Sequence, residues 1–492
     1  MQLTIIGAIQ VLFGLVLFLA GTVEAMFALL LITTLFAGSA AIVLPALGSG
    51  SSIPPLHFAL LFMVLRLLVP GSGQVRATAR ALEANAWLMV FVAYGVVMAF
   101  AGPRLFAGQF AFAPLRADAA ARFTSHLSYL LATRPLGPSP QNLTSAVYLV
   151  GTLITAMVAH VACRAPAGRL TLVRTMAWVG VIHSLLGFLS VVGRGTAIDT
   201  VLGFFRNGAY AQLTQDIDGL SRMTGISPEP SSFAAFGAIW FVFLAECWLR
   251  RVSPLLTGTA ALCLGTALIA CTSATAYVAL AAWLGLLLLR SLFVPGAMPA
   301  DRGLWLAVMG LGGIVAGSVL LLWQPQLASR LLLFLQHVLF DKMASDSGIQ
   351  RRFWALQGYQ AFVGTYGLGV GPGSFRSSSL ITAVLGCVGV VGALALLAQF
   401  LIAFKPLRWS TYVATPDPDL AVAGACAWAM LMAVIVAAVT AANCDPGSDF
   451  ALLSGAALAL RGRNPVRVRQ PQPEPAPEPE PAPRVMLAPA NR

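Results

Sequence analysis

Long uninterrupted runs of apolar residues constrain this chain more than any other feature of its sequence. Most are long enough to cross a bilayer as a helix, which takes roughly 20 residues. Unbroken runs indicate helices, because membrane strands would alternate in polarity. We therefore expect an all-α membrane protein with about 12–13 transmembrane helices. The runs cover residues 3–20, 25–44, 56–69, 84–101, 143–163, 172–192, 231–249, 255–271, 274–289, 303–323, 380–404, 420–442 and 450–460.

The composition agrees with a membrane protein and leaves no room for a soluble domain. Of the 492 residues, 58% are hydrophobic and 10% are charged, whereas a soluble domain has about 25% charged residues. The net charge of +12 in such a chain reflects topology and lipid contact, so we expect membrane lipids as partners and no nucleic acid. The seven cysteines show no C-x-x-C pair and no histidine at metal spacing, which predicts packed thiols and no metal site.

The basic residues of the short connections predict how the chain is oriented in the membrane. If every apolar run crosses the membrane, the short connections that carry these basic residues all lie on one side. The positive-inside rule assigns that side to the cytoplasm. Three long connections, 102–142, 193–230 and 324–379, then lie on the outer face. The basic residues concerned are Arg76, Arg80, Arg164, Arg169, Arg174, Arg250, Arg251, Arg290, Arg302, Lys405, Arg408, Arg461, Arg463, Arg467 and Arg469.

These connections divide the chain into regions. The tail alternates Pro, Glu and Ala and cannot bury apolar area, so we expect a disordered cytoplasmic extension rich in polyproline II. Near the cytoplasmic ends of spans, Arg66 and Glu246 are expected to snorkel to the interface. The predicted regions are N-terminal spans at 1–101, an outer loop at 102–142, a membrane core at 143–460 with the outer loops 193–230 and 324–379, and the tail at 461–492.

The third outer loop carries an unusual polar stretch. Arg351 and Arg352 precede an aromatic-rich segment that we expect to be helical, and the sequence GLGVGPGSFR follows it. Adjacent arginines beside a glycine turn with free amides suit a phosphate group. A charged loop that simply stays in water is the alternative. The candidate binding residues of this stretch are Gly369, Gly371, Gly373, Arg376, Trp354 and Tyr359.

The second outer loop ends in SRMTGISPEPSSFAA and presents Arg222 and Glu229. Pro230 holds the backbone of Glu229 extended and opens the next span, so the carboxylate lies at the positive end of a membrane helix. Its alternative role is to complement the helix dipole. Together the two loops suit a lipid-linked diphosphate whose sugar is transferred, with arginines on the diphosphate and Glu229 orienting or deprotonating an acceptor hydroxyl.

The aromatic residues near these loops have two interpretations, and the acidic residues of a nearby turn have one. Trp354 and Tyr359 are candidates for stacking on sugar rings, but aromatic residues beside a bilayer often serve as interface anchors. Asp445 and Asp449, in NCDPGSDF, lie at an outer turn and are expected to cap the last span.

Three stretches resemble the recurring signatures of the O-antigen ligase/polymerase family of membrane glycosyltransferases. They are SRMTGISPEPSSFAA, CTSATAYVAL and RRFWALQGYQAFVGTYGLGVGPGSFRSSSL, within a match from about Thr171 to Leu460. The resemblance implies a GT-C-like fold and metal-independent, cofactor-free transfer of glycan from undecaprenyl diphosphate at the periplasmic face of the bacterial inner membrane. Arg222, Glu229, Arg351 and Arg352 match the charged loop residues of the family, and Arg376 follows the glycine turn.

Members of that family differ in their acceptor. Ligases typically carry a histidine downstream of the loop arginines, whereas here none follows Arg352 and His337 precedes it. We therefore expect a polymerase of O-antigen or exopolysaccharide, with other polysaccharide assembly and export proteins as candidate partners. The alternatives are a ligase that transfers glycan to lipid A core or to protein, and a flippase or transporter. A flippase would need polar residues in mid-span, and the runs are poor in them. A membrane scaffold would leave the arginine-glycine loop unexplained.

Overall fold

The computed structural model describes residues 2–44, 52–69, 74–115, 131–208, 216–217, 220–324 and 346–462. The proline-rich tail beyond residue 462, His337 and the middle of the first predicted loop lie outside these residues. Every predicted apolar run contains a helix. The helices are α1 (Ile5–Ala20), α2 (Val23–Thr33), α3 (Pro55–Leu68), α4 (Val75–Ala84), α5 (Ala86–Leu105), α7 (Pro140–Cys163), α8 (Pro166–Val192), α9 (Ala197–Phe204), α10 (Pro230–Leu249), α11 (Pro254–Ala270), α12 (Ala274–Phe293), α13 (Ala300–Trp323), α15 (Asp346–Gly364), α16 (Leu380–Phe404), α17 (Pro418–Thr440) and α18 (Gly447–Arg461).

The lengths of these helices define a multi-pass membrane protein. Among the described residues, 8 helices are long and apolar enough to cross a membrane, and α1, α2, α3 and α11 are shorter apolar helices of 10–17 residues. The last predicted run forms α18, which has 15 residues. The expected all-α membrane architecture is therefore confirmed.

Within the described residues, short strands form three small antiparallel sheets, β1–β2–β3, β4–β5 and β6–β7. The register pairs Leu3 with Ile42 and Ile42 with Ile53, and in the second sheet Phe112 with Arg134. The strands are β1 (Gln2–Leu3), β2 (Ile42–Val43), β3 (Ser52–Ile53), β4 (Ala111–Phe112), β5 (Arg134–Pro135), β6 (Asp216–Ile217) and β7 (Leu220–Ser221).

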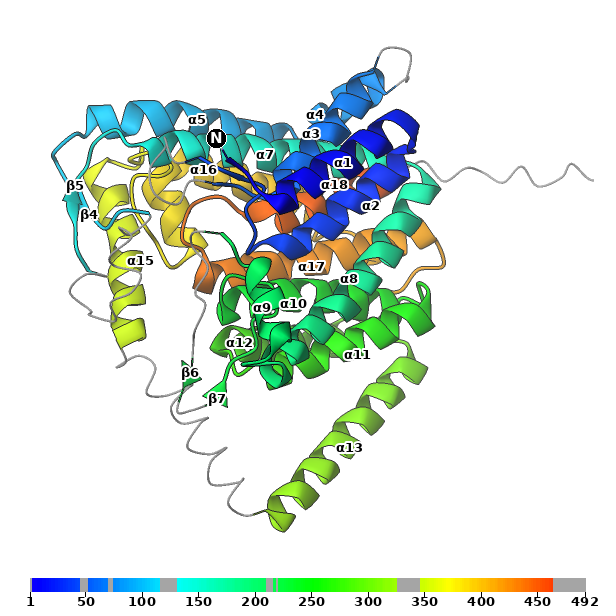
Figure 1. Ribbon diagram of the computed structural model, residues 1–492. Helices are drawn as coiled ribbons and strands as arrows, with labels where there is room; N and C mark the ends of the chain where they lie inside the picture. Colours follow the sequence, from blue (N-terminus) through cyan, green and yellow to red (C-terminus); the bar gives the residue numbers. More distant parts are fainter. Residues whose placement is uncertain are drawn as a thin grey trace, which may run out of the picture.

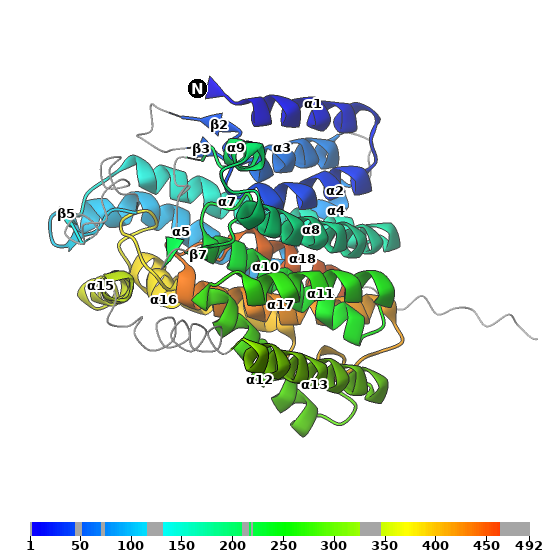
Figure 2. The ribbon, with the colours of Figure 1, turned by 60° about the horizontal axis from the view of Figure 1, so that its bottom comes forward.

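The long helices run side by side, so the bundle has two distinct ends (Figures 1 and 2). We call one the strand end, because β4, β5 and α15 lie there, at the left of both views. The other is the arginine end, where α4 and the connection from α16 to α17 lie. Helix α13 stands off the bundle in Figure 1, and none of its residues is buried.

Proline and capping residues explain where several helices begin. Proline fits the first helical position because its missing N–H would be unpaired there anyway. The Asp417 side chain accepts from two amides of the first turn of α17, and Ser139 with Asn142 forms a capping box at α7. Helices that open on proline are α3, α7, α8, α10, α11 and α17.

Helix α16 is broken near its middle, and the glycine turn of residues 367–373 fills the break. Gly389 has φ 58° and ψ −154° inside the helix. Across the break, Val370 N–H donates to Gly386 O at 2.8 Å, Gly371 N–H donates to Cys387 O at 2.9 Å, and Val390 N–H donates to Gly367 O at 2.9 Å. A broken helix in an apolar environment is stable only where such partners are supplied.

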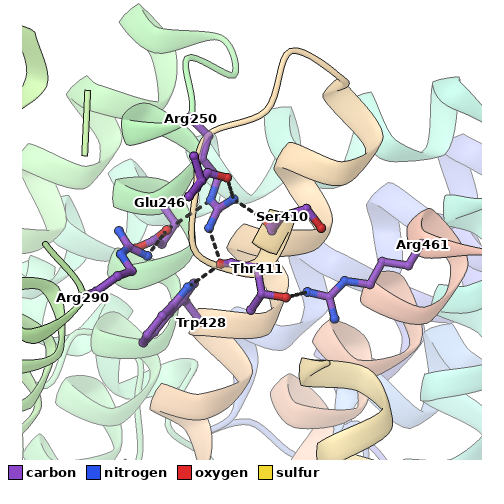
Figure 3. Close-up of polar contacts among 8 residues, drawn as sticks. Glu246, Arg250, Arg290, Ser410, Thr411, Trp428 and Arg461 are labelled. Atoms are coloured by element: carbon purple, nitrogen blue, oxygen red, sulfur yellow. Dashed lines mark hydrogen bonds and ion pairs between the residues drawn. The ribbon is translucent and has the colours of Figure 1, made fainter. Parts of the chain in front are cut away.

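At the arginine end, a buried ionic cluster joins α10, α12 and α18 to the connection between α16 and α17 (Figure 3). Glu246 of α10 binds Arg250 at 3.2 Å and Arg290 of α12 at 2.9 Å. Arg250 also donates to backbone oxygens of residues 410, 411 and 413, and Arg461 of α18 donates to Thr411 Oγ1 at 2.9 Å. Glu246 is only 2% exposed. The prediction that it snorkels is wrong, because two guanidinium groups compensate its charge inside the protein.

We expect Gly371→Ala to destabilise the fold. Gly371 has φ 93°, and a Cβ there would overlap the carbonyl oxygen of Met98 in α5. The matched control is Gly312→Ala in α13, where a Cβ meets nothing within 4 Å. Thermal melting of the purified protein in detergent should show a marked drop in melting temperature for Gly371→Ala and no drop for Gly312→Ala. Equal melting temperatures would contradict the packing of the glycine turn.

We also expect Glu246→Gln to destabilise the protein strongly, because it leaves two buried arginines without their carboxylate. Breaking a buried ion pair costs about 3–5 kcal/mol. The control is Asp301→Asn, which removes an ion pair with Arg251 whose side chains are 49% and 61% exposed. Such exposed pairs contribute at most about 1 kcal/mol. Melting measurements in which both variants behave alike would show that the cluster is not a stabilising element.

Candidate functional site

Glu229 lies at the N-terminus of α10 at the strand end. Its backbone is extended, with φ −155° and ψ 163°, as the following proline predicts. Its carboxylate accepts no hydrogen bond from the first amides of α10, and instead accepts one from the Ser231 hydroxyl. The carboxylate therefore does not cap the helix. Its side chain is held in place by a neighbouring hydroxyl.

Arg376 is positioned by three contacts, two with the residues after β4 and one with α15. Its own backbone N–H donates to Ala113 O at 3.0 Å, and its guanidinium donates to Leu115 O at 3.4 Å. The guanidinium carbon also lies 4.3 Å from the centre of the Trp354 ring, a cation–π contact. Its Nε is buried and has no hydrogen-bond partner among the described residues. The side chain thus has a fixed position and an unused donor.

The adjacent arginines of α15 have different environments. Arg351 Nη1 donates to Val439 O at the end of α17, at 3.2 Å, and its backbone carbonyl accepts from Ser378 Oγ at 2.6 Å. Arg352 is exposed. Successive residues of an α-helix point about 100° apart, so the two side chains do not face the same point. Only Arg351 belongs to the group described next.

Arg222, Glu229, Arg351 and Arg376 form an arginine cluster at the strand end. Burial lowers the pKa of Arg376, Glu229 opposes this shift, and the charge of Arg351 adds to it. Burial likewise lowers the pKa of Arg222, where Cys271 and Glu229 act in the opposite direction and Arg351 adds to the shift. Arginine remains charged at neutral pH despite such shifts. Arg222 and Arg376, from loops distant in sequence, therefore each lie within electrostatic reach of Glu229 and of Arg351.

The amides of Gly369, Val370 and Gly371 are not free, so the prediction of free amides is wrong for this part of the glycine turn. Gly369 N–H donates to Thr365 Oγ1 at 2.9 Å, and the next two amides donate to carbonyls of α16. Residues 369–373 are buried, and a Cβ at Gly373 would overlap Gln141 O of α7. Gly369, Gly371 and Gly373 thus hold the turn against its neighbours. Contacts to a phosphate would have to come from the arginine side chains.

The two aromatic candidates also differ. Trp354 packs under the Arg376 guanidinium, so this face of its ring is covered. Tyr359 is 58% exposed on α15. The structure gives Trp354 a positioning contact with the cluster, and it leaves Tyr359 accessible from outside.

Two residues next to Arg222 were not singled out from the sequence. Both Cys271 and Tyr277 affect the pKa of Arg222, so the turn between α11 and α12 approaches the cluster. Thr272 in that turn has φ 52°, which is unusual for a β-branched residue. The stretch CTSATAYVAL, noted for its family-like pattern, was the available signal. Its individual residues gave no indication of a partner.

The cluster suits an anionic ligand. Guanidinium groups bind phosphate oxygens through charge-assisted hydrogen bonds. Within the described residues, no group of three or more His, Cys, Asp or Glu side chains is placed to hold a metal ion.

Comparison with known proteins gave no match, whether with family models, with curated proteins or with solved structures. The fold and the apolar helices define a multi-pass membrane protein. The resemblance to the O-antigen ligase/polymerase family rests on the three sequence patterns alone.

Proposed function

We propose that this chain is a membrane glycosyltransferase that polymerises glycan repeat units carried on undecaprenyl diphosphate, and that it works at the periplasmic face of the bacterial inner membrane. The observation that carries the proposal is the arginine cluster at the strand end, in which Arg222 and Arg376 each lie within electrostatic reach of Glu229 and of Arg351. The helix ends that border the long connections also lie at this end, whereas the short basic connections lie at the other end (Figure 1). That distribution supports a periplasmic strand end under the positive-inside rule.

In the proposed reaction, a hydroxyl oxygen of the acceptor sugar attacks the anomeric carbon of the donor. The bond from that carbon to the diphosphate oxygen breaks, and the electron pair leaves with the diphosphate. Arg222, Arg351 and Arg376 stabilise the negative charge of this leaving group. Glu229, held by Ser231, orients the acceptor hydroxyl or takes its proton.

Two alternatives are weaker. A ligase is disfavoured because no histidine follows Arg352 in the sequence. A flippase needs polar groups along a path through the membrane. The buried polar residues Asn85, Gln399 and Ser454 instead bond one another, since Gln399 Nε2 donates to Asn85 Oδ1 at 3.0 Å and to Ser454 Oγ at 2.9 Å. They tie α5, α16 and α18 together.

The first test compares Arg351→Ala with Arg352→Ala in a strain that lacks the protein. We expect the wild-type gene to convert accumulated single repeat units into long chains. Arg351→Ala should lower polymer formation by about a hundredfold or more, because one electrostatic contact to the leaving group is lost. Arg352→Ala is the matched control and should retain polymerisation. Membrane levels of each variant and the chain length of surface and secreted polysaccharide are measured.

Each other outcome of this test is informative. Long chains that accumulate on the carrier without reaching lipid A would indicate a ligase. Repeat units trapped on the cytoplasmic face would indicate a flippase. If Arg351→Ala polymerises like wild type, the arginine cluster is not the transfer site.

The orientation has its own test. Reporter fusions are made after Gly108, which follows α5 at the strand end, and after Gly462, which follows α18 at the arginine end. We expect alkaline phosphatase to be active at Gly108 and a fluorescent protein to fold at Gly462, because connections rich in basic residues stay on the cytoplasmic side of the membrane. The reverse pattern would place the arginine cluster in the cytoplasm and contradict the proposed function.

A further inference from the structure

A cavity with two carboxylates lies in the strand end, between α10, α17 and the turn that leads to α18. Its volume is about 210 Å³, and its lining includes Ala235, Ile239, Val436, Thr440, Asp445 and Asp449. This volume is of the order of a single sugar ring, and the space is open to the outside.

The cavity lies directly beside the arginine cluster. On α10, Ala235 follows Ser231 by one turn, and Ser231 donates to Glu229. On α17, Arg351 binds the carbonyl of Val439, whose neighbour Thr440 lines the cavity. Both walls therefore begin at residues that contact the cluster.

Each of the two carboxylates has one oxygen with no hydrogen bond within the described residues. Asp445 Oδ1 accepts from Thr152 Oγ1 at 2.8 Å and from Gly447 N–H at 3.0 Å. Asp449 Oδ1 accepts from Trp240 Nε1 at 3.1 Å. The prediction that Asp449 caps α18 is wrong, because its bond goes to α10. In both residues the hydrogen bonds within the described part of the chain go to Oδ1, which leaves Oδ2 available.

The electrostatic environment of these carboxylates differs from that of Glu229. No arginine or lysine of the described residues forms an ion pair with Asp445 or Asp449. Burial raises the pKa of Asp445, and its hydrogen bonds with Gly447 and Thr152 oppose this. Carboxylates without a cation partner accept hydrogen bonds from neutral hydroxyl groups, which sugars supply in abundance.

We propose that this cavity is the acceptor subsite, in which Asp445 and Asp449 accept hydrogen bonds from hydroxyl groups of the sugar ring that receives the transferred glycan. The inference rests on the proposed function and specifies its acceptor chemistry. The subsite takes a sugar with free hydroxyls and rejects one that carries a carboxylate or sulfate toward the two aspartates, because like charges repel across such a short distance.

The test measures protection of single cysteines by two lipids. Ala437→Cys places a thiol in the cavity lining, and Ser378→Cys places one beside Arg351. Of the native cysteines, only Cys263 is not buried, and it is replaced by alanine. The probes are the lipid-linked repeat unit extracted from the deletion strain and undecaprenyl diphosphate without sugar. Labelling uses a small, water-soluble thiol reagent.

We expect the lipid-linked repeat unit to block labelling at both positions. The sugar-free carrier should block it at Ser378→Cys only. Protection of Ala437→Cys by the sugar-free carrier would overturn the inference, because the cavity would then hold the diphosphate or the lipid chain. Protection at Ser378→Cys by both lipids, with none at Ala437→Cys, would overturn the acceptor subsite while the proposed function stands. No protection at Ser378→Cys would contradict the proposed donor site itself.

Two further variants test the cavity by activity. Ala235→Leu fills it without changing charge, and Asp449→Asn keeps the shape while removing the charge. Each should lower polymer formation by about tenfold or more, because the acceptor hydroxyls lose their partners or their space. Protection of Ser378→Cys by undecaprenyl diphosphate should be unchanged. The control is Ala307→Leu on the exposed helix α13. Normal polymer formation by both Ala235→Leu and Asp449→Asn would overturn the inference.

Discussion

The hydrogen bonds between the glycine turn and the broken helix α16 support the whole strand end. The break exposes Gly386 O, Cys387 O and Val390 N–H, and the turn pairs all of them. Unpaired backbone groups in an apolar environment cost several kcal/mol each, so turn and helix are stable only together. The turn then leads into Phe375, which is buried against Phe112 with ring centres 5.4 Å apart. The next residue is Arg376, whose position over Trp354 follows from this packing.

Arginine serves two different purposes at the two ends of the bundle. At the arginine end, Arg250 donates to Glu246 and to the carbonyls of residues 410, 411 and 413, so its donors are used for structure. At the strand end, Arg376 keeps a buried Nε without a partner in the described chain, and its charge is only partly balanced by Glu229. An arginine with filled donors fixes the fold. Arg376 has a fixed position and shares the carboxylate of Glu229 with Arg222, so its charge suits an anionic ligand.

The sequence predicts the spans well, because the affinity of an apolar run for the bilayer is a local property. It also indicates which loops carry the charged residues. It does not predict how those residues meet. Adjacent arginines suggest a clamp, but helix geometry turns Arg352 away from Arg351. Glycines suggest free amides, but the Gly371 amide donates to α16 and the Gly369 amide donates to Thr365 Oγ1. Glu246 suggests an interfacial side chain, but two arginines make its burial possible. In each case a partner distant in sequence decides the role, and a single sequence does not name that partner.

Charge alone separates the two proposed subsites. The arginine cluster has three positive groups and one negative group, which favours a diphosphate. The adjoining cavity has two carboxylates without ion-pair partners among the described residues, so it repels a diphosphate and admits a neutral sugar. Glu229, the carboxylate of the cluster, lies at the start of the helix whose next turns line the cavity. In polymerisation, the donor and the acceptor each carry both sugar and diphosphate. The difference in charge between the two subsites directs the diphosphate of the donor to the arginine cluster and the sugar of the acceptor to the cavity.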